Sequence, residues 1–169
     1  GQNVRHLEPL GFIKFDILGL ASLRMIEDCI RHILKRKQGV QNPTFDDIKQ
    51  FYLDKLHPEK MDLEDQAVYK NVFHQGKWAG VFQFAEKGAQ RFCSKAKPMS
   101  VIDLSAITSI YRPGPLAANV HEEYVEAKNN PSSVRYIHPL VKEVTGETFG
   151  FLIFQEQIAL LAHKLGKDL

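Results

Sequence analysis

A lysine and an aspartate two residues apart, Lys14 and Asp16, are the first side chains whose spacing suggests chemistry. They lie in the run 11–20, where side chains alternate with a period of two, which predicts a short β-strand. Side chains two apart on a strand share a face, so a carboxylate that can bind Mg²⁺ would stand beside an ammonium group that can meet phosphate. The pair therefore suits an anionic ligand bridged by a metal. An ordinary solvated pair is the alternative interpretation.

A second group of candidate residues is basic and consists of Arg91, Lys95 and Lys97. The helical pattern over 87–96, which Pro98 stops, places these cations on one side of a short helix and its exit. Such a cluster can contact the phosphates of a nucleic acid. A solvated helix face is the other interpretation, and the spacing does not separate the two.

Two further segments hold polar groups in a rigid or an apolar context. Arg112 lies in the motif YRPGP at 111–115, where two prolines fix the backbone and pre-order the guanidinium for phosphate or for stacking on a base. The alternative is that the prolines only end a helix. Gln155 opens a polar triplet at 155–157. Gln155 and Glu156 either face a ligand or satisfy the amides of the first turn of the last helix.

Length and composition limit the class of protein. The 169 residues suffice for a sizeable core, and a net charge of +2 gives no global field that would announce a nucleic-acid partner. Two distant cysteines without metal-type spacing favour reduced thiols in a cytoplasmic protein. No apolar run is long enough for a membrane span, so no membrane partner is expected. Both ends look cut, which predicts a piece of a larger protein.

The elements that position these residues are mostly helices. Apolar residues at helical spacing predict helices over about 20–37, 44–56, 62–75, 87–96, 100–110, 118–128 and 154–165. Short strands or extended segments are predicted over 11–20, 78–84 and 135–138. The expected fold class is mainly α with a few short β-strands (α+β).

Four motifs in order resemble the bacterial C-family replicative DNA polymerases, the alpha subunits of DNA polymerase III. They are GFIKFDILGL at 11–20, GVFQF at 80–84, YRPGPL at 111–116 and FGFLIFQEQ at 149–157. The resemblance implies that residues 1–19 form the end of the palm domain, with its late strand. It also implies that residues 20–169 form the N-terminal part of the largely helical fingers domain.

The resemblance assigns a role to Asp16. This family adds deoxynucleotides to a primer by two-metal phosphoryl transfer, and Asp16 would be the third palm aspartate, both catalytic and metal-binding. Lys14 would lie beside it, and from this position we infer that Lys14 would meet the triphosphate oxygens. The two other aspartates and further palm and fingers elements of the family are absent from the sequence. Since one carboxylate cannot hold two Mg²⁺ ions, this piece is expected to be inactive alone.

The remaining candidates would shape the nucleotide and template side of a cleft. Arg112 and Gln155 would bind the nucleotide, and Arg91, Lys95 and Lys97 the DNA. The implied partners are primer–template DNA, deoxynucleoside triphosphates and, through regions outside this chain, replisome subunits such as a sliding clamp. Two alternatives stay open: a non-catalytic helical DNA- or protein-interaction module, and a separate metal-dependent phosphotransferase.

Overall fold

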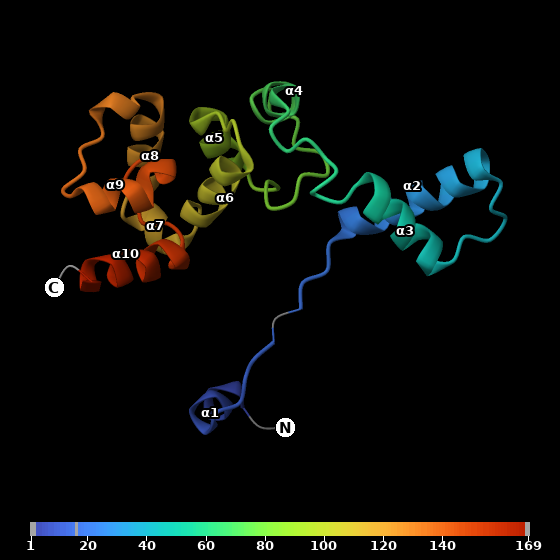
Figure 1. The fold of residues 1–169 in the computed structure, drawn as a ribbon, viewed down its shortest axis with the longest axis horizontal. Coiled ribbons are helices and arrows are strands. Elements are labelled where there is room, and N and C mark those ends of the chain that lie inside the picture. Colours follow the sequence, from blue (N-terminus) through green and yellow to red (C-terminus); the bar gives the residue numbers. More distant parts are fainter. Residues whose placement is uncertain (1–2, 16, 168–169) are drawn as a thin grey trace. The chain divides into compact units, whose positions relative to one another are not determined.

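The computed structural model describes residues 3–15 and 17–167 as helices joined by turns and extended segments (Figure 1). The α-helices are α1 (Val4–Leu7), α2 (Ala21–Gln38), α3 (Phe45–Lys55), α4 (Gln66–Val68), α5 (Lys87–Ala96), α6 (Val101–Ile110), α7 (Pro113–Ala117), α8 (Val120–Asn129), α9 (Pro139–Thr145) and α10 (Gln155–Lys167). Shorter helical turns are η1 (Glu8–Leu10), η2 (Tyr69–Phe73), η3 (Pro131–Ser133) and η4 (Gly146–Thr148). The chain divides into two units, Gly1–Ile48 and Lys49–Leu169.

The first unit contains one long helix, α2, as the sequence predicts. Three basic side chains occupy its last turn, and Gly39 caps it in the left-handed region with φ of 69°. Ile30 and Leu34 are its buried residues. Arg31 donates a hydrogen bond of 3.0 Å to the Pro43 carbonyl, which ties α2 to the loop that follows it.

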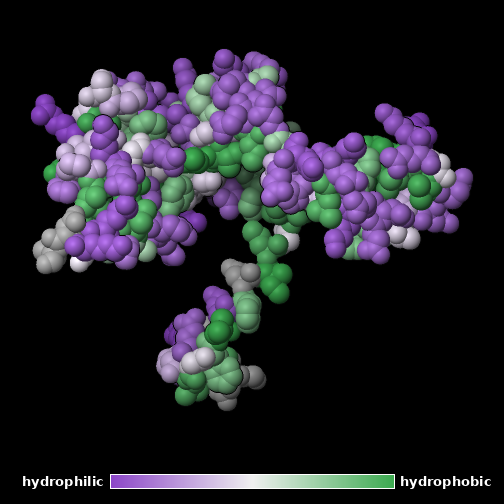
Figure 2. All heavy atoms as spheres, in the orientation of Figure 1, coloured by the Kyte–Doolittle hydropathy of each residue, from purple (hydrophilic) through white to green (hydrophobic). Residues whose placement is uncertain are grey.

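The predicted α+β fold class is wrong, because no residue in the described ranges lies in a β-strand. The segment 11–20 is extended on both sides of residue 16, but no described segment pairs with it. Side chains of both predicted faces are exposed, 63% for Phe12 and 79% for Ile13, and Figure 2 shows an apolar, solvent-facing stretch. A strand needs a neighbour for its N–H and C=O groups, which alternation alone cannot supply.

The other two predicted strands form turns and irregular chain. Two turns closed by backbone hydrogen bonds of 3.0 and 3.4 Å fold the segment 78–84 on itself. Positive φ angles at Gly80 (75°) and Gln83 (66°) are incompatible with a regular strand. Residues 135–138 likewise form irregular chain and a bend. The structure described is therefore all helical, with extended connections.

A contiguous apolar core holds the second unit together. α5 packs against α6 and α8, and α6 also packs against α8. The pattern of α5 explains its place, because its buried residues recur at helical spacing and give the helix one apolar face. These are Ala89, Phe92, Cys93 and Ala96. Aromatic rings from neighbouring elements fill the space around them, among them Tyr69, Phe73, Phe84 and Tyr124.

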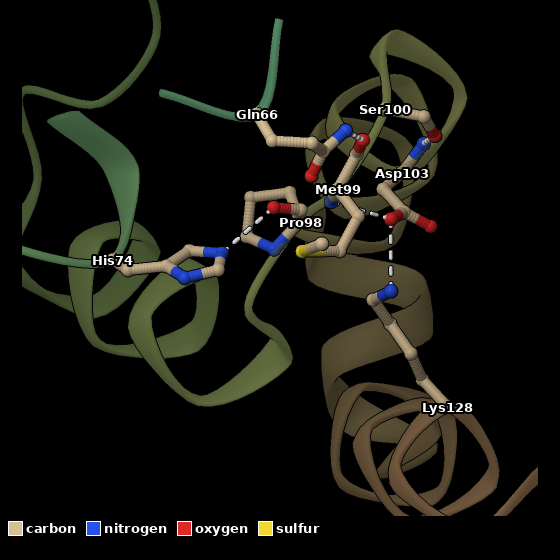
Figure 3. Close-up of polar contacts among 7 residues, drawn as sticks. All are labelled: Gln66, His74, Pro98, Met99, Ser100, Asp103 and Lys128. Carbon is tan, nitrogen blue, oxygen red and sulfur yellow. Dashed lines mark hydrogen bonds and ion pairs between the residues drawn. The ribbon is translucent and has the colours of Figure 1, made fainter. Parts of the chain in front are cut away.

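Polar contacts fix the turn between α5 and α6 (Figure 3). The carboxylate of Asp103 accepts hydrogen bonds of 2.8 Å from the Met99 N–H and from Lys128 Nζ of α8. Both side chains of this ion pair are buried. The ring of His74 forms a hydrogen bond of 2.8 Å with the Pro98 carbonyl. The turn and the two helices that it joins are thus held by groups from distant parts of the unit.

Candidate nucleic-acid interface

The exposed side of α5 carries three cations at helical spacing. Lys87, Arg91 and Lys95 follow one another at intervals of four residues, which places them on one side of the helix, and all three are exposed. The opposite side is buried in the core, so packing fixes which side faces solvent. From first to last, the row extends for roughly 12 Å. We call these three residues the α5 cationic face.

A pocket of about 370 Å³ opens beside this face and is lined by Arg91 and Lys95. Aromatic rings from three elements form much of its remaining wall: Phe92 of α5, Tyr111 at the end of α6 and His121 of α8. The Phe92 and His121 rings pack edge to face, with centroids 5.9 Å apart. The pocket therefore combines guanidinium and ammonium groups with aromatic surfaces, which suits phosphates and bases.

Gly88 makes room for Tyr111 in the wall of this pocket. A Cβ atom at position 88 would clash with the Tyr111 hydroxyl and would lie 2.9 Å from the ring carbon that bears it. Glycine thus lets the phenol ring approach the backbone of α5. Since Tyr111 directly precedes Arg112, this contact anchors the chain just before the guanidinium that the sequence singles out.

A second pocket, of about 530 Å³, borders the same three cations. Its lining also includes Trp78, Gln90 and Ser94. The indole of Trp78 stacks on the buried ring of Phe84, with centroids 5.4 Å apart and an interplanar angle of 15°. A tryptophan held in this way offers a fixed aromatic surface next to the cations.

One cation of the face is paired within the protein. Lys95 Nζ lies 2.8 Å from Glu122 Oε1 of α8, and the two side chains are 58% and 46% exposed. His121 Nε2 lies 3.8 Å from the same oxygen. The hydrogen bond from Lys95 lowers the pKa of the Glu122 carboxyl below its ordinary value. Lys87 and Arg91 form no ion pair with any residue that the structure describes.

The structure brings some of the predicted DNA-contacting residues together and separates others. Arg91 and Lys95 share the α5 cationic face, whereas Lys97 leaves the helix as its C-cap in the left-handed region with φ of 47°. Arg112 is exposed immediately after α6. Sequence analysis missed Lys87, although its position four residues before Arg91 was a usable signal.

The polar triplet at the start of α10 divides between solvent and interior. Gln155 is exposed. Gln157 turns inward, where its side-chain oxygen accepts hydrogen bonds from the Ile153 and Phe154 N–H groups at 2.9 and 3.0 Å. Its amide nitrogen donates to Thr148 Oγ1 at 2.8 Å. Gln157 therefore satisfies backbone amides at the start of the helix. The sequence suggested that role for Gln155 and Glu156, and both of these side chains are exposed.

The predicted metal-binding pair cannot be placed as a pair. Lys14 is exposed in the extended segment, and Asp16 lies outside the described residues. Within ranges 3–15 and 17–167, no group of three or more His, Cys, Asp or Glu side chains is arranged to hold a metal ion. None of the helices described there is both long and apolar enough to cross a membrane.

Comparisons with known proteins identify the family. The family model described as "Bacterial DNA polymerase III alpha subunit finger domain" matches residues 22–167. Similar relatives include the DNA polymerase III alpha subunits of Mycobacterium leprae (strain TN), 33% identical over 162 residues, and Treponema pallidum (strain Nichols), 32% identical over 160 residues. Each of these alignments covers 94% of this chain.

The corresponding subunit of Rickettsia felis (strain ATCC VR-1525 / URRWXCal2) is 34% identical over 169 residues, which cover 98% of this chain. The chain spans 12% of the length of each of these three relatives. Because the family match runs from α2 to the end of α10, it includes the α5 cationic face and both pockets. The chain therefore belongs to the finger-domain family of the bacterial DNA polymerase III alpha subunit.

Proposed function

We propose that this chain is the fingers portion of a replicative DNA-directed DNA polymerase and contacts DNA through the α5 cationic face. Family membership supports the polymerase assignment. The observation that carries the DNA contact is the row of exposed cations Lys87, Arg91 and Lys95 between two pockets with aromatic walls. Cations neutralise backbone phosphates and aromatic rings stack on bases, so the two features together suit a nucleic acid without sequence readout.

The predicted domain assignment is part of this proposal. Residues 1–19 belong to the end of the palm and residues 20–169 to the N-terminal part of the fingers. Arg112 and Gln155, both exposed, serve the nucleotide side of the cleft. Lys97, exposed at the end of α5, extends the DNA contact beyond the helix. The substrates are primer–template DNA and deoxynucleoside triphosphates, and replisome subunits such as a sliding clamp bind elsewhere on the parent protein.

The metal belongs to the parent protein rather than to this piece. The described residues do not fit a two-metal site, because they offer no cluster of ligands. In the proposed assignment, Asp16 contributes one carboxylate to a Mg²⁺ site completed by residues outside this chain, and Lys14 contacts phosphate. We expect this chain to be inactive alone, because one carboxylate cannot hold two Mg²⁺ ions, and we expect the complete enzyme to act in the cytoplasm.

Replacing Arg91 by alanine in the full-length parent polymerase tests the contact. We expect the apparent KM for primer–template DNA in a primer-extension assay to rise and the salt dependence of DNA binding to fall by about one phosphate contact. The melting temperature is expected to change little, because the guanidinium is exposed.

Lys70→Ala is the matched control, since this exposed lysine of η2 lines neither pocket. Both substitutions remove one positive charge from an exposed side chain. If they raise the KM equally, net charge explains the effect and the α5 cationic face is not the DNA contact. An unchanged KM for Arg91→Ala would reject the proposal directly.

A further inference from the structure

A carboxylate beside the α5 cationic face is unexpected in a surface that binds phosphates. Glu122 is partly exposed, and its Oε1 lies 2.8 Å from Lys95 Nζ. Glu122 lines the same pocket as Arg91 and Lys95. A carboxylate repels an approaching phosphate and also occupies the cation that the phosphate would use.

The fold fixes the position of this carboxylate. α5 and α8 pack against each other (Figure 1), and the residues on both sides of Glu122 hold it there. The ring of His121 packs edge to face on Phe92 of α5, with centroids 5.9 Å apart. Tyr124 is fully buried and packs on the same phenylalanine, with centroids 6.4 Å apart. Glu122 therefore stands opposite Lys95 because the core places it there.

We propose that Glu122 competes with DNA for the α5 cationic face. Its carboxylate forms an ion pair with Lys95 in the free protein, and a DNA phosphate must displace this carboxylate to reach the lysine. This inference rests on the proposed DNA contact. Displacement is feasible because the pair is exposed, and exposed ion pairs are weak and screened by salt. Glu122 lies on a packed helix, so its carboxylate pairs with Lys95 again when the ligand leaves.

Competition by Glu122 makes the α5 cationic face selective for ligands of high charge. A single small anion that takes Lys95 from Glu122 exchanges one ion pair for another and gains little. A polyanion that also reaches Lys87 and Arg91 adds contacts that have no internal competitor among the described residues. Glu122 is thus a specificity-determining residue, and its removal strengthens binding rather than weakening it.

The test measures binding of a fluorescein-labelled primer–template DNA to the full-length parent polymerase by fluorescence anisotropy over a range of salt concentrations. Glu122→Gln is expected to tighten binding about two- to fivefold at low salt. The slope of the salt dependence should stay nearly unchanged, because Lys95 contacts a phosphate in both bound proteins and the number of neutralised phosphates is the same. Glu123→Gln is the matched control, since both glutamates lie in the first turn of α8 and lose the same charge.

Lys95→Gln completes the design as a double-mutant cycle. In the Lys95→Gln background, Glu122→Gln is expected to give no gain beyond that of Glu123→Gln. Two outcomes would contradict the competition by Glu122 while leaving the DNA contact intact. One is an equal gain in DNA affinity from the two glutamate variants, and the other is a gain from Glu122→Gln that persists without Lys95. Unchanged DNA affinity for Arg91→Ala, Lys95→Gln and Glu122→Gln alike would reject the DNA contact and the competition by Glu122 together.

Discussion

Helix α8 takes part in two lysine–carboxylate pairs of the same length in different surroundings. Lys128 of α8 lies 2.8 Å from Asp103 of α6, and the two side chains are 10% and 8% exposed. Glu122 of α8 lies 2.8 Å from Lys95 of α5, and these side chains are 46% and 58% exposed. The helix and the distance are shared, so burial is the main difference between the pairs.

The buried pair is part of the fold. Asp103 also accepts a hydrogen bond from the Met99 N–H, and Lys128 Nζ lies 5.4 Å from the centroid of the Phe149 ring (Figure 3 shows the contacts of the carboxylate). Water cannot replace either partner without opening the core. The exposed pair is open to solvent and exchanges partners at little cost. Equal distances therefore imply a structural role in one place and a replaceable contact in the other.

The largest expected effect comes from breaking the buried pair with Lys128→Met. The substitution leaves the carboxylate of Asp103 buried without its cation, which costs about 3–5 kcal/mol in the free energy of unfolding. Urea denaturation of this chain followed by circular dichroism measures the loss. Adding Asp103→Asn should recover a substantial part of it, because the amide keeps an acceptor for the Met99 N–H without the charge. A loss as small as that of a surface substitution would show that the pair is not structural.

A smaller effect is expected from alkaline pH, which acts on the buried side of α5. Burial raises the pKa of the Cys93 thiol from 9.0 to about 12. Above about pH 9 the unfolded chain releases this proton while the folded chain keeps it. The stability contributed by the neutral thiol is therefore complete below pH 9 and is lost as the pH rises toward 12.

Melting temperatures of the wild type and of Cys93→Ala across this pH range check the prediction. We expect the curve of the variant to fall less steeply on the alkaline side, even though the variant starts from a lower melting temperature because of its cavity. Burial also raises the pKa of Tyr69 and Tyr124, so both proteins share a remaining alkaline decline. Parallel curves for the two proteins would contradict a role for the thiol.

Several helices could be predicted because their signals are local. The boundaries of α5 agree with the prediction, and Ser100 caps α6 through a hydrogen bond of 3.1 Å from the Asp103 N–H. α9 was missed because it has only seven residues and its sequence shows no periodic apolar stripe of useful length. The third helix begins at Gln66 instead of near residue 62, because Asp65 supplies its N-cap.

The strands could not be predicted correctly, because strand formation depends on a partner. The alternation over 11–20 is real, but no segment among the described residues pairs with it. The apolar run at 78–84 contains aromatic side chains for the core rather than for a sheet. Trp78 and Phe84 reach the core through turns that need a positive φ at Gln83, which the sequence does not signal.

The interface was only partly predictable for the same reason. The shared helix face of Arg91 and Lys95 could be predicted because a helical period links them. Glu122 and Tyr111, which complete the pocket, lie on other helices or their ends, and only the packing of α5 with α6 and α8 brings them there. A sequence can thus indicate the charges of one helix face, but not the groups that a second helix places opposite them.

The smallest expected effect on stability comes from the exposed pair, through Lys95→Met. The change in side chain is the same as in Lys128→Met, so the two variants isolate the effect of burial. Because Lys95 is 58% exposed, the melting temperature should stay within about 2 °C of the wild type. The affinity for DNA should fall, in contrast, since Lys95 belongs to the proposed contact and its loss removes a phosphate partner. If Lys95→Met lowered the melting temperature as far as Lys128→Met, burial would not explain the difference between the pairs. The carboxylate of Glu122 would then stabilise the fold instead of competing with DNA for Lys95.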